Sequence, residues 1–291
     1  MSVYKHEYRA YAGRLTTPLA RIGVLTRYAY AEAWASRITT ALFVVAFLPI
    51  VVYLVGIYLA NNPLVRTIIL RGKDSFISID ASFFMRVLSS QCWLAVVLTA
   101  WVAPRLVSFD ISDNALPILL SHPISRFGYV AGKFTALFSF LSLITWVPCI
   151  GLFVYQAYSS PVPWADSHLR IGAGLLAGSL LWIVVLSLLG LALSSWVKWR
   201  VVATGVIFAA IFVPAGIGGI VSAILHTRWG FLLNVPVIMT QLWQRMLGAP
   251  QIMAGELTLP TGAIAAVLLL LCALSMAILN ARIRAREVVR G

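Results

Sequence analysis

The sequence has very few charged residues. Only 11% of its 291 residues are Asp, Glu, Lys or Arg, and 61% are hydrophobic. A soluble domain carries about 25% charged residues, so this chain cannot cover a soluble surface and we expect an integral membrane protein. Its hydrophobic runs are continuous rather than short and alternating, which favours helices over a membrane β-barrel.

The sequence also lacks the patterns of common catalytic and metal sites. Its three cysteines, Cys92, Cys149 and Cys272, have no metal-ligand spacing, so we interpret them as small core residues without disulfides. The four histidines are dispersed along the chain. No glycine-rich loop is followed by Lys and Ser or Thr, so no P-loop for ATP is present. We expect no catalytic residue, metal or cofactor in this chain.

Six charge-free runs are each at least as long as the roughly 18 apolar residues of a membrane-spanning helix. The sequence therefore predicts an all-α fold with six spans, near 38–60, 87–106, 133–157, 171–196, 201–224 and 261–281. No ionisable residue falls well inside these spans. Because intramembrane ionisable residues mark proton and ion pathways, their absence argues against a proton-driven pump.

The basic residues are unevenly distributed, and the net charge is +13. With both termini in the cytoplasm, fifteen of the 22 basic residues fall on the inside and seven outside. This agrees with the positive-inside rule for an even number of spans. The charge thus has a topological explanation, and we expect no nucleic acid as a partner. The prediction is a multi-pass protein of the cell inner membrane.

The chain divides into a cytoplasmic segment, 1–37, and a membrane domain, 38–291. Within the cytoplasmic segment, apolar residues at helical spacing beside Arg and Glu predict an amphipathic helix over 21–37 that lies on the inner surface of the membrane. A plain extension of the first span is the alternative. The stretch 226–260, between spans 5 and 6, is too long for a turn and predicts short outer amphipathic or re-entrant helices.

Prolines and glycines interrupt three of the spans. Pro148 predicts a kink in span 3, and the run from Pro214 to Gly219 predicts a break or a kink in span 5 at membrane depth. Gly174 and Gly178 form a small-xxx-small face where another helix can approach closely. As the shared surface of a dimer or a transport path, we consider span 1 and these residues: Pro214, Gly216, Gly218, Gly219, Gly174 and Gly178.

A polar stretch, 105–133, separates spans 2 and 3. We expect span 2 to end at Pro104-Arg105 and span 3 to start from Ser125 as its N-cap. Between them, Asp113 can cap a short cytoplasmic helix that Pro123 ends.

The amino-acid sequence of this stretch is more informative than its polarity. It contains Pro-Arg-Leu-Val-Ser at 104–108, Asp-Ile-Ser-Asp-Asn-Ala-Leu-Pro-Ile-Leu-Leu-Ser-His-Pro-Ile-Ser-Arg at 110–126, and Gly132-Lys133. It resembles the segment between spans 2 and 3 of type-2 ABC transporter permeases. The surface helix, the proline in the first span and the outer segment between spans 5 and 6 are also similar to that family.

The resemblance implies a partner and a transport function. In that family a separate ATP-binding cassette subunit holds ATP and Mg²⁺ and contacts the surface helix and the loop between spans 2 and 3. The short helix in that loop is the coupling helix. Two permease copies, identical or paralogous, pair around a central path. By resemblance, the residues that contact the ATP-binding subunit are Asp110, Asp113, Asn114, Ser121, Pro123 and Arg126.

We therefore expect the membrane subunit of an ATP-driven exporter, not itself an enzyme. Its uncharged, aromatic-rich interior suits a lipid-like or amphipathic substrate, and membrane lipids surround it. The alternative is a membrane enzyme or an assembly scaffold without transport. For that alternative the candidate polar sites are the outer stretch from Trp164 to His168, which includes Asp166, and Glu256.

Overall fold

The structure is a computed structural model that describes residues 17–62, 78–112, 125–160, 164–251 and 258–287. Within these ranges all regular secondary structure is helical, and there is no strand. Six segments are long and apolar enough to cross a membrane. They are α2 (Arg37–Asn61), α4 (Ala81–Ser112), α6 (Arg126–Ile144) continued by α7 (Trp146–Ser159), α8 (Trp164–Trp196), α9 (Arg200–Leu225) and α11 (Thr261–Glu287). The predicted all-α, six-span membrane fold is confirmed.

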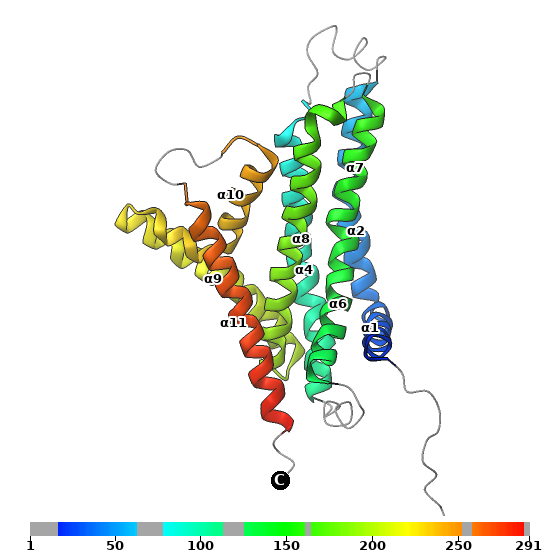
Figure 1. Cartoon of the computed structure of the whole chain (residues 1–291), viewed down its shortest axis with the longest axis vertical. Helices are drawn as coiled ribbons and strands as arrows, with labels where there is room; N and C mark the ends of the chain where they lie inside the picture. The colour runs from blue at the N-terminus through cyan, green and yellow to red at the C-terminus, as the bar shows by residue number, and fades with distance from the viewer. Residues whose placement is uncertain (1–16, 63–77, 113–124, 161–163, 252–257, 288–291) are drawn as a thin grey trace, which may run out of the picture.

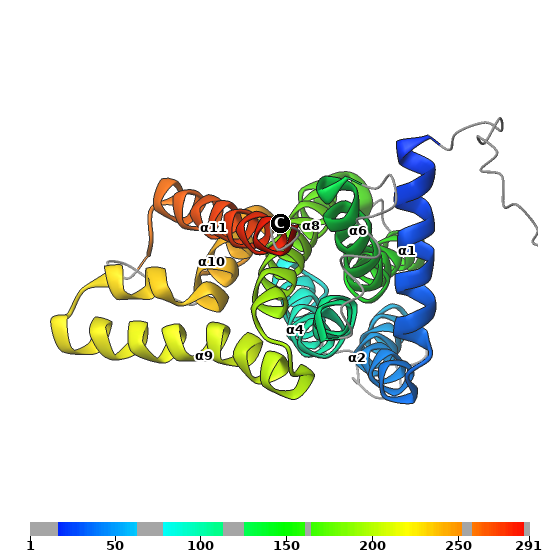
Figure 2. The same ribbon diagram turned by 90° about the horizontal axis from the view of Figure 1, so that it is seen from below.

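The helices form a bundle with α4 and α8 at its centre (Figures 1 and 2). In the most apolar stretch of α4, 67% of the residues are buried, and in that of α8, 61%. The corresponding share is only 11% in α2 and 22% in both α9 and α11. Protein packing therefore holds the central helices, while α2, α9 and α11 offer their apolar faces to lipid or to another chain.

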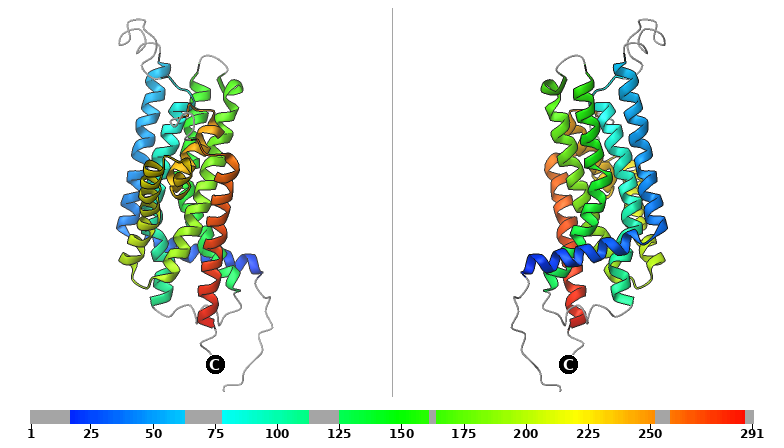
Figure 3. Two further views of the ribbon diagram at one scale, coloured as in Figure 1. Left: turned by 90° about the vertical axis from the view of Figure 1, so that its left-hand side faces the viewer. Right: turned by 90° about the vertical axis from the view of Figure 1, so that its right-hand side faces the viewer.

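The helix α1 (Pro18–Trp34) lies crosswise at one end of the bundle, beside the start of α2 (Figure 3). Thr17 caps it by accepting a hydrogen bond from the Ala20 amide at 3.3 Å. The chain then turns at Ala35, and Ser36 caps α2 in the same way. The predicted surface helix is thus separate from the first span, and the alternative of one continuous helix is wrong. We call this end the α1 end.

The predicted end of span 2 at Pro104-Arg105 is wrong, because α4 continues through Pro104 to Ser112. Side chains beyond the proline are held by tertiary packing: Leu106 is fully buried and Ser108 Oγ donates to the Ser194 carbonyl of α8 at 3.0 Å. These contacts offset the backbone hydrogen bond that a proline cannot make.

Span 3 is interrupted at Thr145, three residues before Pro148, the proline that predicts a kink in this span. Thr145 has φ −107° and ψ −91°, and it separates α6 from α7. Since a proline ring clashes with the carbonyl four residues earlier, here that of Ile144, the distortion falls before the proline rather than at it.

Of the break or kink predicted in span 5, the break is wrong, because α9 is one helix from Arg200 to Leu225 with Pro214 inside it. Instead, the glycines of this region let another backbone approach. The short 3₁₀ helix η1 (Arg228–Leu233) packs on α9, and a β-carbon added to Gly218 would lie 2.4 Å from the Gly230 carbonyl oxygen. This contact, and not a break, explains why a small residue is required at Gly218.

The predicted short helices between spans 5 and 6 are η1 and α10 (Val235–Leu247), and α10 packs along α8 (Figure 1). The small-residue face of α8 receives it. Trp243 Nε1 donates to the Gly178 carbonyl at 3.0 Å, and a β-carbon on Gly174 would lie 2.9 Å from Leu247. Arg170 of α8 completes the joint by donating to the Arg245 carbonyl at 2.6 Å. The close approach predicted at Gly174 and Gly178 is therefore made by α10 of the same chain.

Candidate functional site: the junction of α1, α4 and α6

The polar stretch between spans 2 and 3 begins and ends at the α1 end of the bundle. Asp110 lies in the last turn of α4, and Arg126 is the first residue of α6. Four of the six predicted contact residues lie outside the described ranges: Asp113, Asn114, Ser121 and Pro123.

Asp110 joins α4 to α6 through a largely buried ion pair. Lys133 Nζ lies 2.8 Å from Asp110 Oδ2, and the side chains are only 7% and 14% exposed. The Tyr129 hydroxyl donates to the same carboxylate oxygen at 2.7 Å. A buried carboxylate needs such donors because desolvation penalises its charge. Sequence reasoning named Asp110 as a contact for another subunit, whereas here its carboxylate bonds within the chain.

The surface helix α1 docks on the same part of α6. Thr26 Oγ1 donates to the Gly132 carbonyl at 3.2 Å. A β-carbon added to Gly132 would lie 2.9 Å from Leu25 Cβ, so only glycine permits this approach. The Gly132-Lys133 pair therefore performs two tasks side by side, since the glycine accepts α1 and the lysine binds α4.

Aromatic rings extend this contact along α6 and α2. The Tyr30 and Phe140 rings stack at 4.4 Å between centroids, and Trp34 lies edge-on to Phe43 of α2 at 4.9 Å. Burial raises the pKa of the Tyr30 phenol, because ionisation would place a charge in an apolar environment, and a hydrogen bond with Ser139 opposes that rise. The phenol stays neutral and α1 is fixed to two spans at once.

The first turn of α6 is capped as the sequence predicts. Ser125 Oγ accepts a hydrogen bond from the Gly128 amide at 3.0 Å. Together with the Asp110–Lys133 ion pair, this cap defines both flanks of the stretch 113–124. The two flanks therefore belong to helices that the ion pair holds together.

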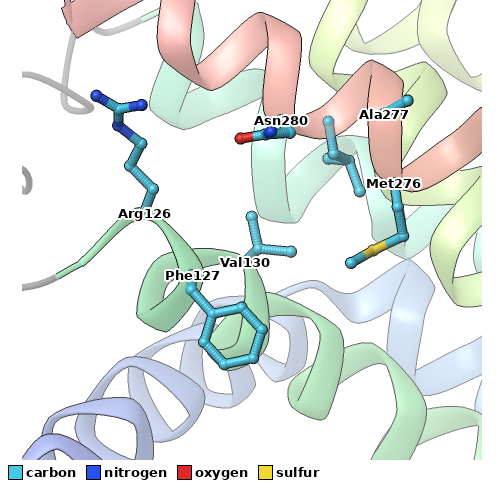
Figure 4. Close-up of a pocket in the computed structure, with 7 residues that line it drawn as sticks. Arg126, Phe127, Val130, Met276, Ala277 and Asn280 are labelled. Atoms are coloured by element: carbon cyan, nitrogen blue, oxygen red, sulfur yellow. The ribbon is translucent and has the colours of Figure 1, made fainter.

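An open groove lies beside this junction, between α6 and α11 (Figure 4). Its volume is about 410 Å³, and its lining is apolar apart from Arg126 and Asn280 at the α1 end. The apolar lining residues are Phe127, Val130, Met276, Ala277 and Leu279. Such a groove fits a hydrocarbon chain with a polar group beside the arginine.

The region around Pro214 on α9 is only partly covered. Gly218 is buried under η1, while Gly216 and Gly219 have open space where a β-carbon would stand. Pro214 is half-buried. This face of α9 therefore retains room for a neighbour.

The stretch from Trp164 to His168 has a local structural role. The His168 ring stacks on Trp164 with centroids 4.2 Å apart, and His168 Nδ1 lies 2.8 Å from the Trp164 carbonyl oxygen. Across the described ranges, no three His, Cys, Asp or Glu side chains are grouped as a metal site would require. Glu256 lies outside the residues that the structure describes.

No protein-family model matches the chain, and no curated protein matches it.

Proposed function

We propose that this chain is the membrane subunit of an ATP-binding cassette exporter, with ATP and Mg²⁺ bound by a separate cytoplasmic subunit. The carrying observation is the Asp110–Lys133 ion pair, which fixes the flanks of the loop whose wording resembles the coupling helix. A lever that transmits force must be held rigidly at both ends, and this pair supplies that property.

In this proposal the α1, α4 and α6 junction transmits closure of the ATP-binding subunits to the spans. Asp113, Asn114, Ser121, Pro123 and Arg126 contact the partner. Asp110 does not contact the partner but keeps α4 and α6 together, through its ion pair with Lys133, when the partner displaces the loop. Because coupling is reciprocal in binding free energy, an occupied transport path changes nucleotide affinity in the partner as nucleotide changes the path.

The distribution of charge supports a cytoplasmic α1 end. Eleven basic residues of the described ranges belong to that end and four to the other, which is the sense of the positive-inside rule. Those at the α1 end are Arg21, Arg27, Arg37, Arg105, Arg126, Lys133, Lys198, Arg200, Arg282, Arg284 and Arg286. Both termini are then cytoplasmic, in the inner membrane.

Two peripheral helices support pairing with a second permease copy or a paralogue. The exposed face of α2 carries Val44, Leu48, Val51, Val52 and Val55. On α9, Phe212, Val213, Ile217 and Ile220 are at least half exposed. We propose that α2 and α9 form the shared surface, with Pro214, Gly216 and Gly219 beside the path.

The groove between α6 and α11 supports an amphipathic or lipid-like substrate. Its apolar lining matches an alkyl chain, and Arg126 and Asn280 supply polar groups at one end. This is a lateral entrance from the inner half of the bilayer, and it lies next to the loop that the partner is proposed to drive.

The test is purification of the native complex and measurement of its ATPase activity in lipid nanodiscs. We expect an ATP-binding subunit to co-purify, and hydrolysis to require both chains. The variant Asp113→Lys/Arg126→Glu should insert normally but lose partner binding or stimulated hydrolysis. Its matched control, Asp166→Lys/Arg86→Glu, changes the same charges at the other end of the bundle and should retain both.

Normal complex recovery and full transport in Asp113→Lys/Arg126→Glu would make the loop a passive connection and overturn the proposal. Turnover of a lipid-linked substrate by the chain alone would favour the membrane enzyme instead. Recovery of a stable assembly without nucleotide hydrolysis would favour a scaffold.

A further inference from the structure

A second polar cluster lies at the α1 end, built on α4 and the start of α9. The Arg200 guanidinium carbon lies 4.1 Å from the centre of the Trp101 ring, a cation–π distance. Arg105 follows Trp101 by one turn of α4, on the same face of the helix. Thr204 Oγ1 donates to the Ala100 carbonyl at 2.8 Å, which fixes α9 against α4. The cluster therefore has a defined geometry.

This cluster contains hydrogen-bond donors without acceptors. Arg105 Nε and Trp101 Nε1 are both buried, and neither has a hydrogen-bond partner among the described residues. The amides at the start of α9 also lack a side-chain cap, because the N-cap residue is Trp199. Buried donors are normally satisfied, and here the missing component is of one kind, an acceptor.

The electrostatics of the cluster point the same way. The positive charges of Arg105 and Arg200 repel each other, and no acidic side chain of the described ranges forms an ion pair with either. Asp110, the acid of α4 nearest in sequence, is already bound to Lys133 and Tyr129. The start of a helix adds a partial positive charge. An anion beside the two guanidinium groups would relieve the repulsion and could accept hydrogen bonds from the uncapped amides at the start of α9.

The surroundings of the cluster are those of a membrane interface. Trp196, Trp199 and Val201 are 61%, 75% and 83% exposed. Exposed tryptophans at the end of membrane helices sit at headgroup level, with their apolar bodies toward the acyl chains. An anion held here therefore has hydrocarbon beside it, as a phospholipid phosphate does.

We propose that Arg105, Arg200 and the start of α9 form a binding site for the phosphate of an anionic phospholipid in the leaflet at the α1 end. The two guanidinium groups bind phosphate oxygens, for which their planar donor arrangement is suited. Trp101 supports Arg200 from below, and Trp199 and Val201 contact the acyl chains. A lipid at this site bridges α4 and α9 at their shared end.

The test is native mass spectrometry of the delipidated full-length protein, titrated with phosphatidylglycerol or phosphatidylcholine of identical acyl chains. For the wild type we expect one phosphatidylglycerol to bind about tenfold more tightly than the others and than phosphatidylcholine. The double variant Arg105→Gln/Arg200→Gln should lose that tight event. The control Arg27→Gln/Arg37→Gln removes the same charge from exposed positions at the same end and should keep it.

Arg105 is half-buried, so the double variant could fold poorly. Arg200→Gln alone keeps Arg105 in place and should weaken the tight event several-fold while leaving the unfolding temperature without lipid unchanged. Equal loss of binding in the variants and the control would overturn the proposal, as would equal affinity for the two lipids. Displacement of the tight lipid by excess inorganic phosphate would assign the site to a soluble anion and overturn it too.

Discussion

Lys133 of α6 reaches Asp110 of α4 across 2.8 Å, and this ion pair is shielded from solvent on both sides. Asp110 lies in the last turn of α4, just before the loop that resembles a coupling helix, and Lys133 lies seven residues after Arg126, where α6 begins beyond that loop. The loop is therefore joined to two helices, α4 and α6, that this ion pair holds together. A rigid junction of this kind has consequences for stability, which can be measured without knowing the substrate.

Breaking one side of this pair should be costly. Removing one member of a buried ion pair typically destabilises a protein by about 3–5 kcal/mol, because the other charge remains buried. We expect Lys133→Met to lower the unfolding temperature in detergent clearly, and Asp110→Asn/Lys133→Met to recover most of the loss. The exposed Lys198→Met is the control and should be silent. A loss in the double variant equal to the sum of the losses in Lys133→Met and in Asp110→Asn would show that the charges act independently.

The contact between α9 and η1 should depend on one glycine and not on its neighbour. Gly218→Ala places a methyl group 2.4 Å from the Gly230 carbonyl oxygen, so we expect a destabilisation of about 1–3 kcal/mol from overpacking. Gly216→Ala has nothing within 4 Å. It should be neutral or stabilise the helix by up to about 1 kcal/mol. Thermal unfolding of both variants checks this, and equal unfolding temperatures would contradict the backbone contact.

The proposed orientation can be checked by cysteine labelling in intact cells. In a background without Cys92, Cys149 and Cys272, a membrane-impermeant maleimide should label Ser167→Cys, which is exposed near the start of α8. The same reagent should miss Ser112→Cys at the end of α4 until the membrane is opened. Labelling of Ser112→Cys in intact cells would reverse the topology.

The proposed pairing of two permease copies can be checked by cross-linking. Val52 of α2 is 69% exposed within the single chain, whereas Ile57 on the same helix is fully buried. In native membranes we expect Val52→Cys to give a dimer with a short bifunctional maleimide, and Ile57→Cys to remain monomeric. Monomer alone at Val52 and at Ile220 of α9 would count against this surface.

The spans could be predicted from sequence because a bilayer imposes a minimum length on apolar runs, and that length is visible in one dimension. The effect of each proline on its helix was harder to predict. Pro104 lies inside a helix because Leu106 and Ser108 pack beyond it, and Pro148 distorts the chain at Thr145. The effect of a proline depends on which neighbours can replace its missing hydrogen bond, and those neighbours come from other helices.

The position of the candidate site in the chain could be predicted, but the contacts between its side chains could not. The polarity of the stretch around Asp110 indicated a loop at the membrane surface, and its wording indicated a partner. Nothing in the spacing indicated that Asp110 binds Lys133, because ion pairs between helices follow from how the helices pack. The pairing of Trp101 with Arg200 was missed for the same reason.

The packing of α10 on α8 also sets an order for biogenesis. Trp243 bonds to Gly178, 65 residues earlier in the chain. At a synthesis rate of about 5–20 residues per second, α8 leaves the ribosome roughly 3–13 s before the helix that covers its glycine face. During that interval the uncovered glycine face of α8 must be shielded by lipid or by the insertion machinery. A nascent chain stalled between α8 and α10 is therefore the species most exposed to wrong helix pairing and to quality-control proteases.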